Sequence, residues 1–156
     1  MSRRSAGGAA SANWSGNVRW DPVEVVRPVN VAELRKTLDR ARSKGRTVRP
    51  AGSRHSFTPL CATDGISLDL DAFSGITGID GDVVTVGAGT PLHELNVALD
   101  GIGRAIANLG DIDRQTISGA ISTGTHGTGA RFGGLASMVA SLTLVTAAGD
   151  EVHCSP

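Results

Sequence analysis

The sequence predicts an α+β fold in which short strands alternate with helices, arranged as two small lobes. Segments rich in β-branched residues are followed by segments with helical spacing, and 156 residues suffice for one compact unit with a core. Glycine is abundant, at 21 residues, whereas aromatic residues make up only 3% of the chain. Many glycines without low complexity indicate tight turns and close approach of the backbone to a ligand.

The first lobe is expected to run from residue 13 to about residue 72 and to begin with a strand and a helix. Val23–Arg27 is a β-branched run that a proline ends, which is typical of a strand. Asn30 is expected to cap the helix, with Glu33 at the capping-box position and Gly45 at its end. Three apolar residues recur at helical spacing between them: Leu34, Leu38 and Ala41.

Two further strands and a polar loop complete this lobe. Thr47–Arg49 predicts a strand, after which Pro50 is expected to open a loop that extends to Phe57. Ile66–Leu70 alternates apolar and polar residues, which predicts a half-buried strand.

The second lobe, about residues 73–156, is expected to begin with a hairpin and a helix. Residues 76–87 predict a hairpin that turns at Asp80-Gly81. The helix is expected to begin at Pro91, since proline is tolerated at the first helical position, and to run to about Leu99.

The rest of this lobe predicts strands on either side of a glycine-rich segment. Arg104–Asn108 and Val139–Thr146 are the expected strands, and a final hairpin passes through Gly149-Asp150. With no closing element after that hairpin, the lobe is expected to be incomplete at its C-terminus.

Composition excludes several classes of protein. Lys+Arg 15 against Asp+Glu 15 leaves no net charge to hold a nucleic acid or an anionic membrane. Cys61 and Cys154 form no Cys-x-x-Cys pair, so a reducing, cytoplasmic location is expected. No apolar run is long enough for a membrane segment, and residues 1–12, despite two adjacent arginines, are expected to be a disordered tail.

The glycine-rich segment 110–134 is a candidate anion site. It contains neither Gly-x-Gly-x-x-Gly opening a helix nor Gly-Lys-Ser/Thr, which excludes a Rossmann turn and a P-loop. Small residues would let main-chain N–H groups surround a polyanion, with Thr116 capping a short helix. The alternative from composition is a flexible loop without a ligand, against which the Ile and Ala positions indicate packing. Asp111 and Asp113, near the start of this segment, are possible bases, but turn or cap roles are commoner for such residues.

The loop Pro50–Phe57 is the second candidate. It can present several N–H groups to one anion, with Arg54 to balance the charge. His55 is either a hydrogen-bonded loop residue or, as a neutral imidazole, a nucleophile toward an electrophilic cofactor. The other histidines are weaker candidates, and no group of residues has metal-ligand spacing, so no metal is expected.

Five motifs in this order resemble the FAD domain of vanillyl-alcohol-oxidase-type flavoproteins, in particular the gulonolactone, arabinonolactone and alditol oxidases. They are Pro50–Phe57, Asp64-Gly65, Gly87–Gly89, Gly110–Asp113 and Gly119–Gly129. The resemblance covers the chain from about Asn13 and implies two α+β subdomains with FAD extended between them.

The resemblance also implies a set of cofactor contacts. His55 matches the histidine that many members join covalently to the 8α-methyl carbon of the flavin, and its loop matches the one that wraps the pyrophosphate. The implied FAD-binding residues are Pro50, Ala51, Gly52, Ser53, Arg54, His55, Ser56, Asp111, Thr116, Gly119, Thr123, Gly124, Thr125 and His126.

The activity that the family implies is hydride transfer from the CH–OH carbon of a sugar lactone or polyol to the flavin. Family members continue into a substrate domain, which is expected to be absent here, so no catalytic residue is assigned. Two alternatives stay open: a non-catalytic FAD-binding remnant, and a stand-alone FAD subunit of a larger electron-transfer complex. The Arg54–Phe57 motif, with its histidine, argues against the second alternative.

Overall fold

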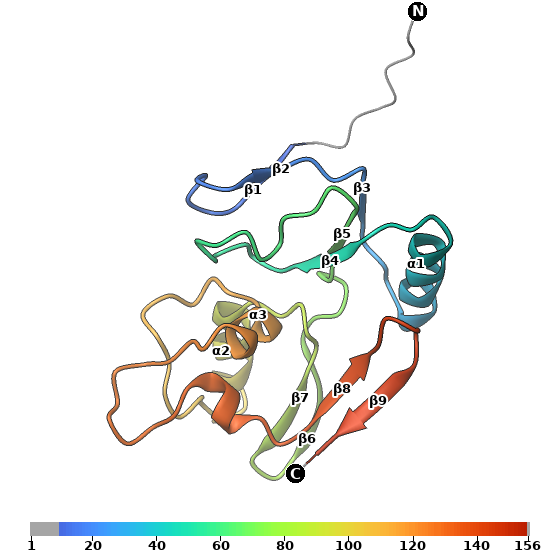
Figure 1. The fold of residues 1–156 in the computed structure, drawn as a ribbon. Helices are drawn as coiled ribbons and strands as arrows, with labels where there is room; N and C mark the ends of the chain where they lie inside the picture. The colour runs from blue at the N-terminus through green and yellow to red at the C-terminus, as the bar shows by residue number, and fades with distance from the viewer. Residues whose placement is uncertain (1–9, 156) are drawn as a thin grey trace, which may run out of the picture.

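The structure is a computed structural model that describes residues 10–155, which form four small sheets (Figure 1). β1 (Ser11–Ala12) pairs antiparallel with β2 (Arg19–Trp20). The disordered tail predicted over residues 1–12 is therefore wrong at its last two residues, which form a strand, while residues 1–9 lie outside the described residues.

A parallel sheet with strand order β3-β5-β4 follows. It consists of β3 (Glu24–Val26), β4 (Val48–Ala51) and β5 (Ile66–Asp69), and all four residues of β5 are buried. The predicted strand exists, but the prediction that it is half-buried is wrong. The middle strand of a parallel sheet is paired at both edges and covered on both faces, which its own sequence pattern does not reveal.

Helix α1 (Val31–Ser43) confirms the predicted start and end signals. The Asn30 side chain accepts a hydrogen bond from the Glu33 N–H at 2.9 Å, and the Glu33 carboxylate accepts one from the Val29 N–H at 3.0 Å. Gly45 follows the helix with φ +59°, a conformation that glycine adopts without steric cost.

Strand β4 continues past the point where a loop was expected to open. Pro50 and Ala51 pair with Leu68 and Asp69, so the loop begins at Gly52 instead. β4 is an edge strand, where a residue without an N–H can point its nitrogen away from the sheet.

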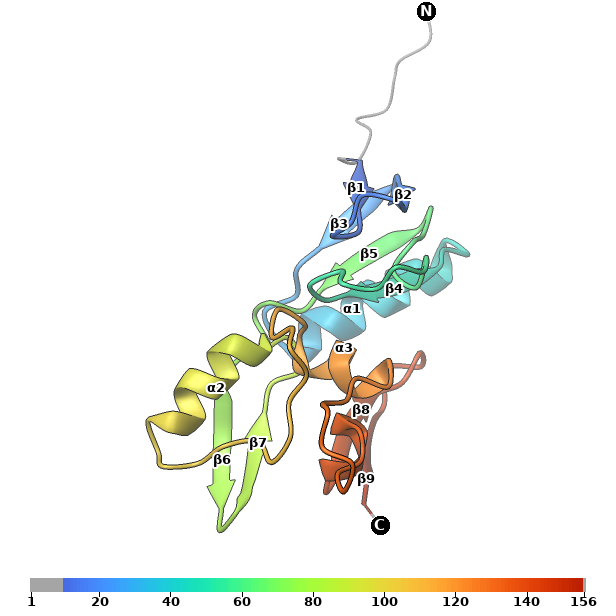
Figure 2. The same cartoon turned by 90° about the vertical axis from the view of Figure 1, so that its left-hand side faces the viewer.

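The second group of elements surrounds helix α2 (Leu92–Asp100), beside which lies the hairpin of β6 (Ile76–Asp80) and β7 (Val83–Val86) (Figure 2). The hairpin is confirmed, but Asp80 pairs with Val83, so its turn is Gly81-Asp82. Pro91 caps α2 instead of being its first helical residue. The core of this group consists of Leu92, Leu95, Leu99, Ala120 and Leu135.

The strand predicted at Arg104–Asn108 is wrong, because these residues form an irregular connection. Arg104 contacts the turn of the β6–β7 hairpin, with its guanidinium 2.9 Å from the Asp82 carboxylate and 2.8 Å from the Gly81 carbonyl oxygen. This segment is therefore held by side-chain contacts with the hairpin turn and not by hydrogen bonds to a neighbouring strand.

Two short helices and a second hairpin complete the described chain. α3 (Ile117–Ser122) and the 3-10 helix η1 (Leu135–Met138) precede β8 (Leu142–Val145) and β9 (Glu151–Cys154). The predicted final hairpin is confirmed, with its turn at Gly149, where φ is +90°. Its first strand begins at Leu142, three residues after the expected Val139.

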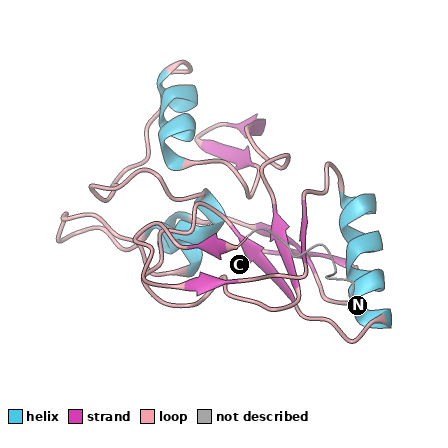
Figure 3. Ribbon diagram, turned by 90° about the horizontal axis from the view of Figure 1, so that it is seen from above, coloured by secondary structure: helices cyan, strands magenta, loops and turns pink. Residues whose placement is uncertain are grey.

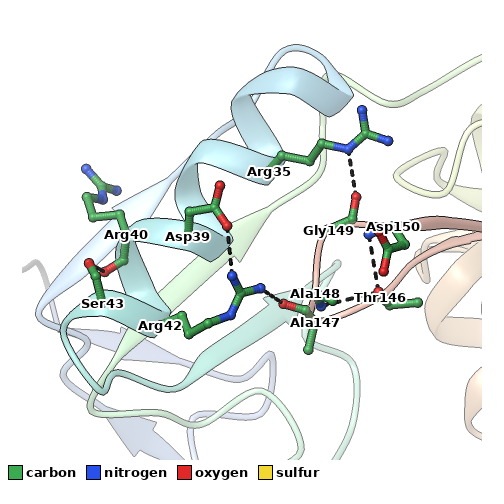
Figure 4. Close-up of polar contacts among 10 residues, drawn as sticks. All are labelled: Arg35, Asp39, Arg40, Arg42, Ser43, Thr146, Ala147, Ala148, Gly149 and Asp150. Atoms are coloured by element: carbon green, nitrogen blue, oxygen red, sulfur yellow. Dashed lines mark hydrogen bonds and ion pairs between the residues drawn. The ribbon is translucent and has the colours of Figure 1, made fainter.

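The β8–β9 hairpin turns toward α1 (Figures 1 and 4). Arg35 donates to the Gly149 carbonyl at 2.7 Å and forms an ion pair with Glu151 at 2.8 Å, while Arg42 donates to the Ala147 carbonyl at 2.6 Å. Seen from above, α1 lies at one side of the molecule and α2 with its hairpin at the other (Figure 3). The division into lobes at residues 72 and 73 stays a prediction, and the last hairpin of the expected second lobe contacts the first.

Candidate functional site

The loop that carries His55 leaves the parallel sheet at its carboxyl edge. Parallel strands end at the same edge, and in α/β sheets this edge is the usual place for ligands. Arg54 has φ +59° and is the only residue other than glycine with positive φ among the described residues. Such a backbone conformation is costly for a residue that has a Cβ atom and persists only where surrounding contacts hold it.

Charged side chains gather at this edge. Arg27, after β3, forms an ion pair with Asp69, at the end of β5, with Nε and Oδ2 3.0 Å apart. Burial alone would raise the pKa of Asp69, but hydrogen bonds with Asp71 and Arg27 and the charge of Arg27 lower it. The same hydrogen bond with Asp69, together with burial and the Asp69 charge, raises the pKa of Asp71.

His55 lies against the N-terminal segment of the chain. Its ring stacks on Trp14, with ring centroids 5.2 Å apart and planes inclined by 20°. The backbone N–H of Trp14 donates to the Arg54 carbonyl at 2.9 Å, and the Asn13 side chain donates to the Ser56 carbonyl at 2.8 Å. The guanidinium of Arg54 lies 5.8 Å from the centroid of the Trp20 ring.

Thr116 anchors the glycine-rich segment. It is buried, it caps the six-residue helix α3, and its hydroxyl accepts from the Gly119 N–H at 3.4 Å. The Ile117 N–H donates to the Thr90 carbonyl at 2.8 Å, which holds the start of α3 against the segment before α2.

The two candidate segments meet at Gly52 and Thr116. A Cβ atom added at Gly52 would overlap the Thr116 hydroxyl, so only glycine allows this approach. Residues 64 positions apart, which the sequence predicted as two parts of one site, are therefore neighbours in space.

The other predicted residues of the glycine-rich segment have partners within it. The Thr123 hydroxyl donates to the Gly119 carbonyl at 2.8 Å, and Thr125 shares a hydrogen bond of 3.0 Å with Gln115. His126 is exposed, with Nδ1 2.9 Å from the Gly127 carbonyl oxygen. Gly124 has φ +68°, and Asp111 is exposed on the connection before α3.

Sequence reasoning missed three residues at this site. Trp14 and Asn13 hold the His55 loop. The sequence signal that could have pointed to Trp14 is that it is one of only two tryptophans in a chain poor in aromatic residues. Asn108 falls in the predicted strand that does not form. Its side-chain oxygen lies so close to Gly127 that a Cβ added there would overlap it.

Two buried donors make the site suitable for an anionic cofactor. Four buried side-chain atoms lack a hydrogen-bond partner among residues 10–155: Trp20 Nε1, Arg54 Nε, Ser67 Oγ and Asn108 Nδ2. Of these, Arg54 lies in the His55 loop and Asn108 lies just before the glycine-rich segment. Buried donors without partners are rare and indicate a missing acceptor, which phosphate oxygens can supply. These donors and the close approach at Gly52 fit a dinucleotide with a pyrophosphate, as FAD is.

Two hollows lie on other parts of the described surface. One hollow of about 550 Å³ is lined by Trp20, Asp21 and residues 62–64, and another of about 380 Å³ lies between α3, η1 and the β8–β9 hairpin. None of the predicted FAD-binding residues lines either hollow.

Residues 10–155 show no sign of a membrane-spanning helix, a metal cluster or a reactive thiol. No described helix is long and apolar enough to span a membrane. Among the described residues, no three His, Cys, Asp or Glu side chains are grouped so that they could hold a metal ion. Burial raises the pKa of the Cys61 thiol, which keeps it protonated and weakly nucleophilic.

Comparison with known proteins agrees with this geometry. A family model described as an FAD binding domain matches residues 22–155. L-gulono-1,4-lactone dehydrogenase from Mycobacterium tuberculosis is 39% identical over 146 residues, which cover 92% of this chain and 34% of the relative. L-gulonolactone oxidase from Scyliorhinus torazame is 34% identical over 145 residues, which cover 92% of this chain and 33% of the relative. The chain thus spans about a third of the length of these curated relatives.

A solved structure of cholesterol oxidase from B. sterolicum has the same fold. It aligns with a TM-score of 0.76 over 94% of this chain and 31% of that chain, at 23% identity. The predicted α+β fold of the vanillyl-alcohol-oxidase type is thereby confirmed. Because the FAD binding domain model matches residues 22–155, which are most of this chain, the chain belongs to the FAD binding domain family.

Proposed function

We propose that this chain is the FAD-binding part of an oxidoreductase that acts on the CH–OH groups of sugar lactones or polyols. The observation that carries the proposal is the contact of Gly52 with Thr116, which joins the His55 loop to the glycine-rich segment. The relatives named as gulonolactone oxidoreductases support the substrate class.

Each segment would hold a different part of the cofactor. Arg54 and Asn108 carry two of the four buried side-chain atoms that lack a partner within residues 10–155, and their N–H groups suit phosphate oxygens. The missing side chain at Gly52 leaves room for the Thr116 hydroxyl, which brings the two segments together to face one ligand. When bound, the flavin would supply the hydride acceptor, while the part of the enzyme that orients the alcohol would lie outside this chain.

His55 is proposed as the covalent attachment site. Its imidazole would be the nucleophile toward the flavin ring's 8α-methyl carbon. Attachment replaces one C–H bond and one imidazole N–H bond by one C–N bond, and dioxygen accepts the two electrons and two protons released, as hydrogen peroxide.

The test is the absorption spectrum and intact mass of the purified protein, before and after acid precipitation. Yellow colour in the acid pellet and a mass increase of one FAD, both lost in His55→Ala, are expected. His153→Ala is the matched control, because His153 lies on the exposed strand β9 and should leave the attachment unchanged. Colour released into the supernatant would show that FAD is bound but not covalently attached, which would reject the attachment proposal.

A colourless protein that also takes up no added FAD would contradict the binding proposal itself. Activity is tested separately, with the full-length protein and a panel of sugar lactones and polyols. Flavin bleaching under anaerobic conditions is expected with at least one of them. Absence of bleaching with every member would reject this substrate class.

A further inference from the structure

His55 has no hydrogen bond to either ring nitrogen from residues 10–155; its recorded ring contact is with Trp14. Reactive histidines are usually oriented by a hydrogen bond to the second ring nitrogen. In the described chain, the stack on Trp14 is therefore the contact available to fix the plane of the imidazole.

Trp14 is itself held in place by its backbone and by a second aromatic ring. Its N–H donates to the Arg54 carbonyl at 2.9 Å, and its ring meets Phe57 edge-on, with centroids 6.3 Å apart and planes at 88°. The side chain is 67% exposed, so burial in a core does not explain its position. An exposed tryptophan held at one orientation over a candidate nucleophile indicates a role at that nucleophile.

Asn13 fixes the segment that carries Trp14. It is 7% exposed, and its Nδ2 lies 2.6 Å from Asn17 Oδ1 and 2.8 Å from the Ser56 carbonyl oxygen. Its Oδ1 accepts from the Val18 N–H at 3.0 Å, which closes the turn through residues 13–18. Asn17 donates to the Phe57 carbonyl at 3.2 Å, so the turn is tied to the His55 loop on both sides of the stack.

We infer that Trp14 is a positioning residue for His55, and that the turn 13–18 clamps the loop on which His55 lies. The indole covers one face of the imidazole and holds its plane, so the ring nitrogens keep a fixed direction. Toward a flavin bound in place, a nucleophile held in one orientation reacts faster because less rotational freedom is lost at the reaction step. Toward a free reagent in solution, the indole that covers the ring slows the reaction instead. The significance for flavin attachment rests on the proposed function, whereas the clamp itself does not.

The test measures how fast diethyl pyrocarbonate acylates each of the four histidines in the full chain, by mass spectrometry of peptides, with the His55 rate taken from the His55 peptide that carries no flavin. Trp14→Ala uncovers the ring, and His55 acylation is expected to rise several-fold, while the rates at His126 and His153 stay unchanged as internal controls. Trp14→Phe retains an aromatic face and should restore the slow rate.

Phe132→Ala is the matched control variant. Phe132 is also an exposed aromatic residue, and within residues 10–155 it makes no ring contact with Trp14 or His55. Its removal should leave the His55 rate close to that of the unmodified chain. Equal His55 rates in the unmodified chain and Trp14→Ala would overturn the inference.

If all four histidines accelerate together in Trp14→Ala, the variant has unfolded, and Trp14→Leu takes its place. Leucine keeps apolar bulk but lacks the aromatic face, so selective acceleration at His55 is again expected, and an unchanged rate overturns the inference. The second readout is the fraction of His55 peptide that carries flavin, expected to fall several-fold in Trp14→Ala. Absence of flavin on His55 in the unmodified chain would reject the attachment proposal and leave the acylation result to decide on the clamp.

Discussion

At Gly52, a hydrogen atom in place of a side chain allows two distant segments to touch. An added Cβ would overlap the Thr116 hydroxyl, and Thr116 is buried and cannot move aside freely. The site therefore depends on this glycine through a steric contact, separately from any backbone strain, since its φ is not in the left-handed region.

Gly52→Ala is expected to destabilise the fold by about 1–3 kcal/mol, the usual cost of overpacking, and to weaken FAD binding. The measurements are denaturant unfolding and FAD titration. The variant Gly52→Ala with Thr116→Ala removes the overlapping hydroxyl and should cost less than the sum of the two single changes. Strict additivity would contradict the steric explanation.

The Asp69–Asp71 pair predicts a pH effect of opposite sign at its two members. The lowered pKa of Asp69 stabilises the fold above its unfolded-state pKa, and this contribution is lost as pH falls through the folded pKa. The raised pKa of Asp71 acts in reverse: ionised Asp71 opposes folding once the pH exceeds its folded pKa.

Asp71→Asn should therefore raise the free energy of unfolding at neutral pH, by less than about 1 kcal/mol because the group is exposed to solvent. The gain should vanish in acid, where Asp71 is protonated. Unfolding curves at a series of pH values check this, and a gain that stays constant into acid would contradict it. Asp39→Asn, on the exposed face of α1, is a control for loss of one charge.

At the scale of elements, local signals predicted what local interactions decide. The cap and end of α1 follow from Asn30, Glu33 and Gly45, whose contacts lie within a few residues. The burial of β5 and the irregular path of Arg104–Asn108 depend on strands and turns far away in sequence, so no local pattern revealed them.

The candidate site divides in the same way. Its two segments were predicted from composition and resemblance, since glycine and threonine patterns are local. The Trp14 stack on His55 joins residues 41 positions apart and was missed, because a single tryptophan in a polar stretch does not specify its partner.

The contact of the β8–β9 hairpin with α1 predicts how that hairpin responds to mutation. Arg35→Ala removes both the hydrogen bond to Gly149 and the ion pair with Glu151, so faster amide hydrogen exchange is expected over residues 142–154. Exchange in α2 should stay the same. Arg40→Ala, on the same helix as Arg35, breaks the ion pair of Arg40 with Glu24 of β3; it is the control and should leave the hairpin unaffected. Equal exchange in the Arg35→Ala and unmodified hairpins would show that the turn is held otherwise.

At the scale of the whole molecule, the described chain exposes apolar side chains on a hairpin with unpaired edges. Leu142, Leu144 and Val152 are all exposed, and β8 and β9 pair only with each other among the described strands. Exposed edges with apolar side chains favour association with another surface.

The chain is therefore expected to self-associate as its concentration rises, as measured by analytical ultracentrifugation. Leu144→Lys should reduce the association, because a charge on the hairpin opposes edge pairing. Val97→Lys is the control, since Val97 is 75% exposed but lies on helix α2 and not on a strand. A monodisperse monomer at all concentrations would contradict this prediction.

Both tryptophans of the protein lie beside the loop that carries His55, one stacked on the imidazole and the other under the Arg54 guanidinium. Flavins absorb light at the wavelengths that indole rings emit, so a flavin in the proposed site would quench both by energy transfer. The intrinsic emission of the protein would then report the occupancy of the site directly, and loading and release could be followed in real time without a label.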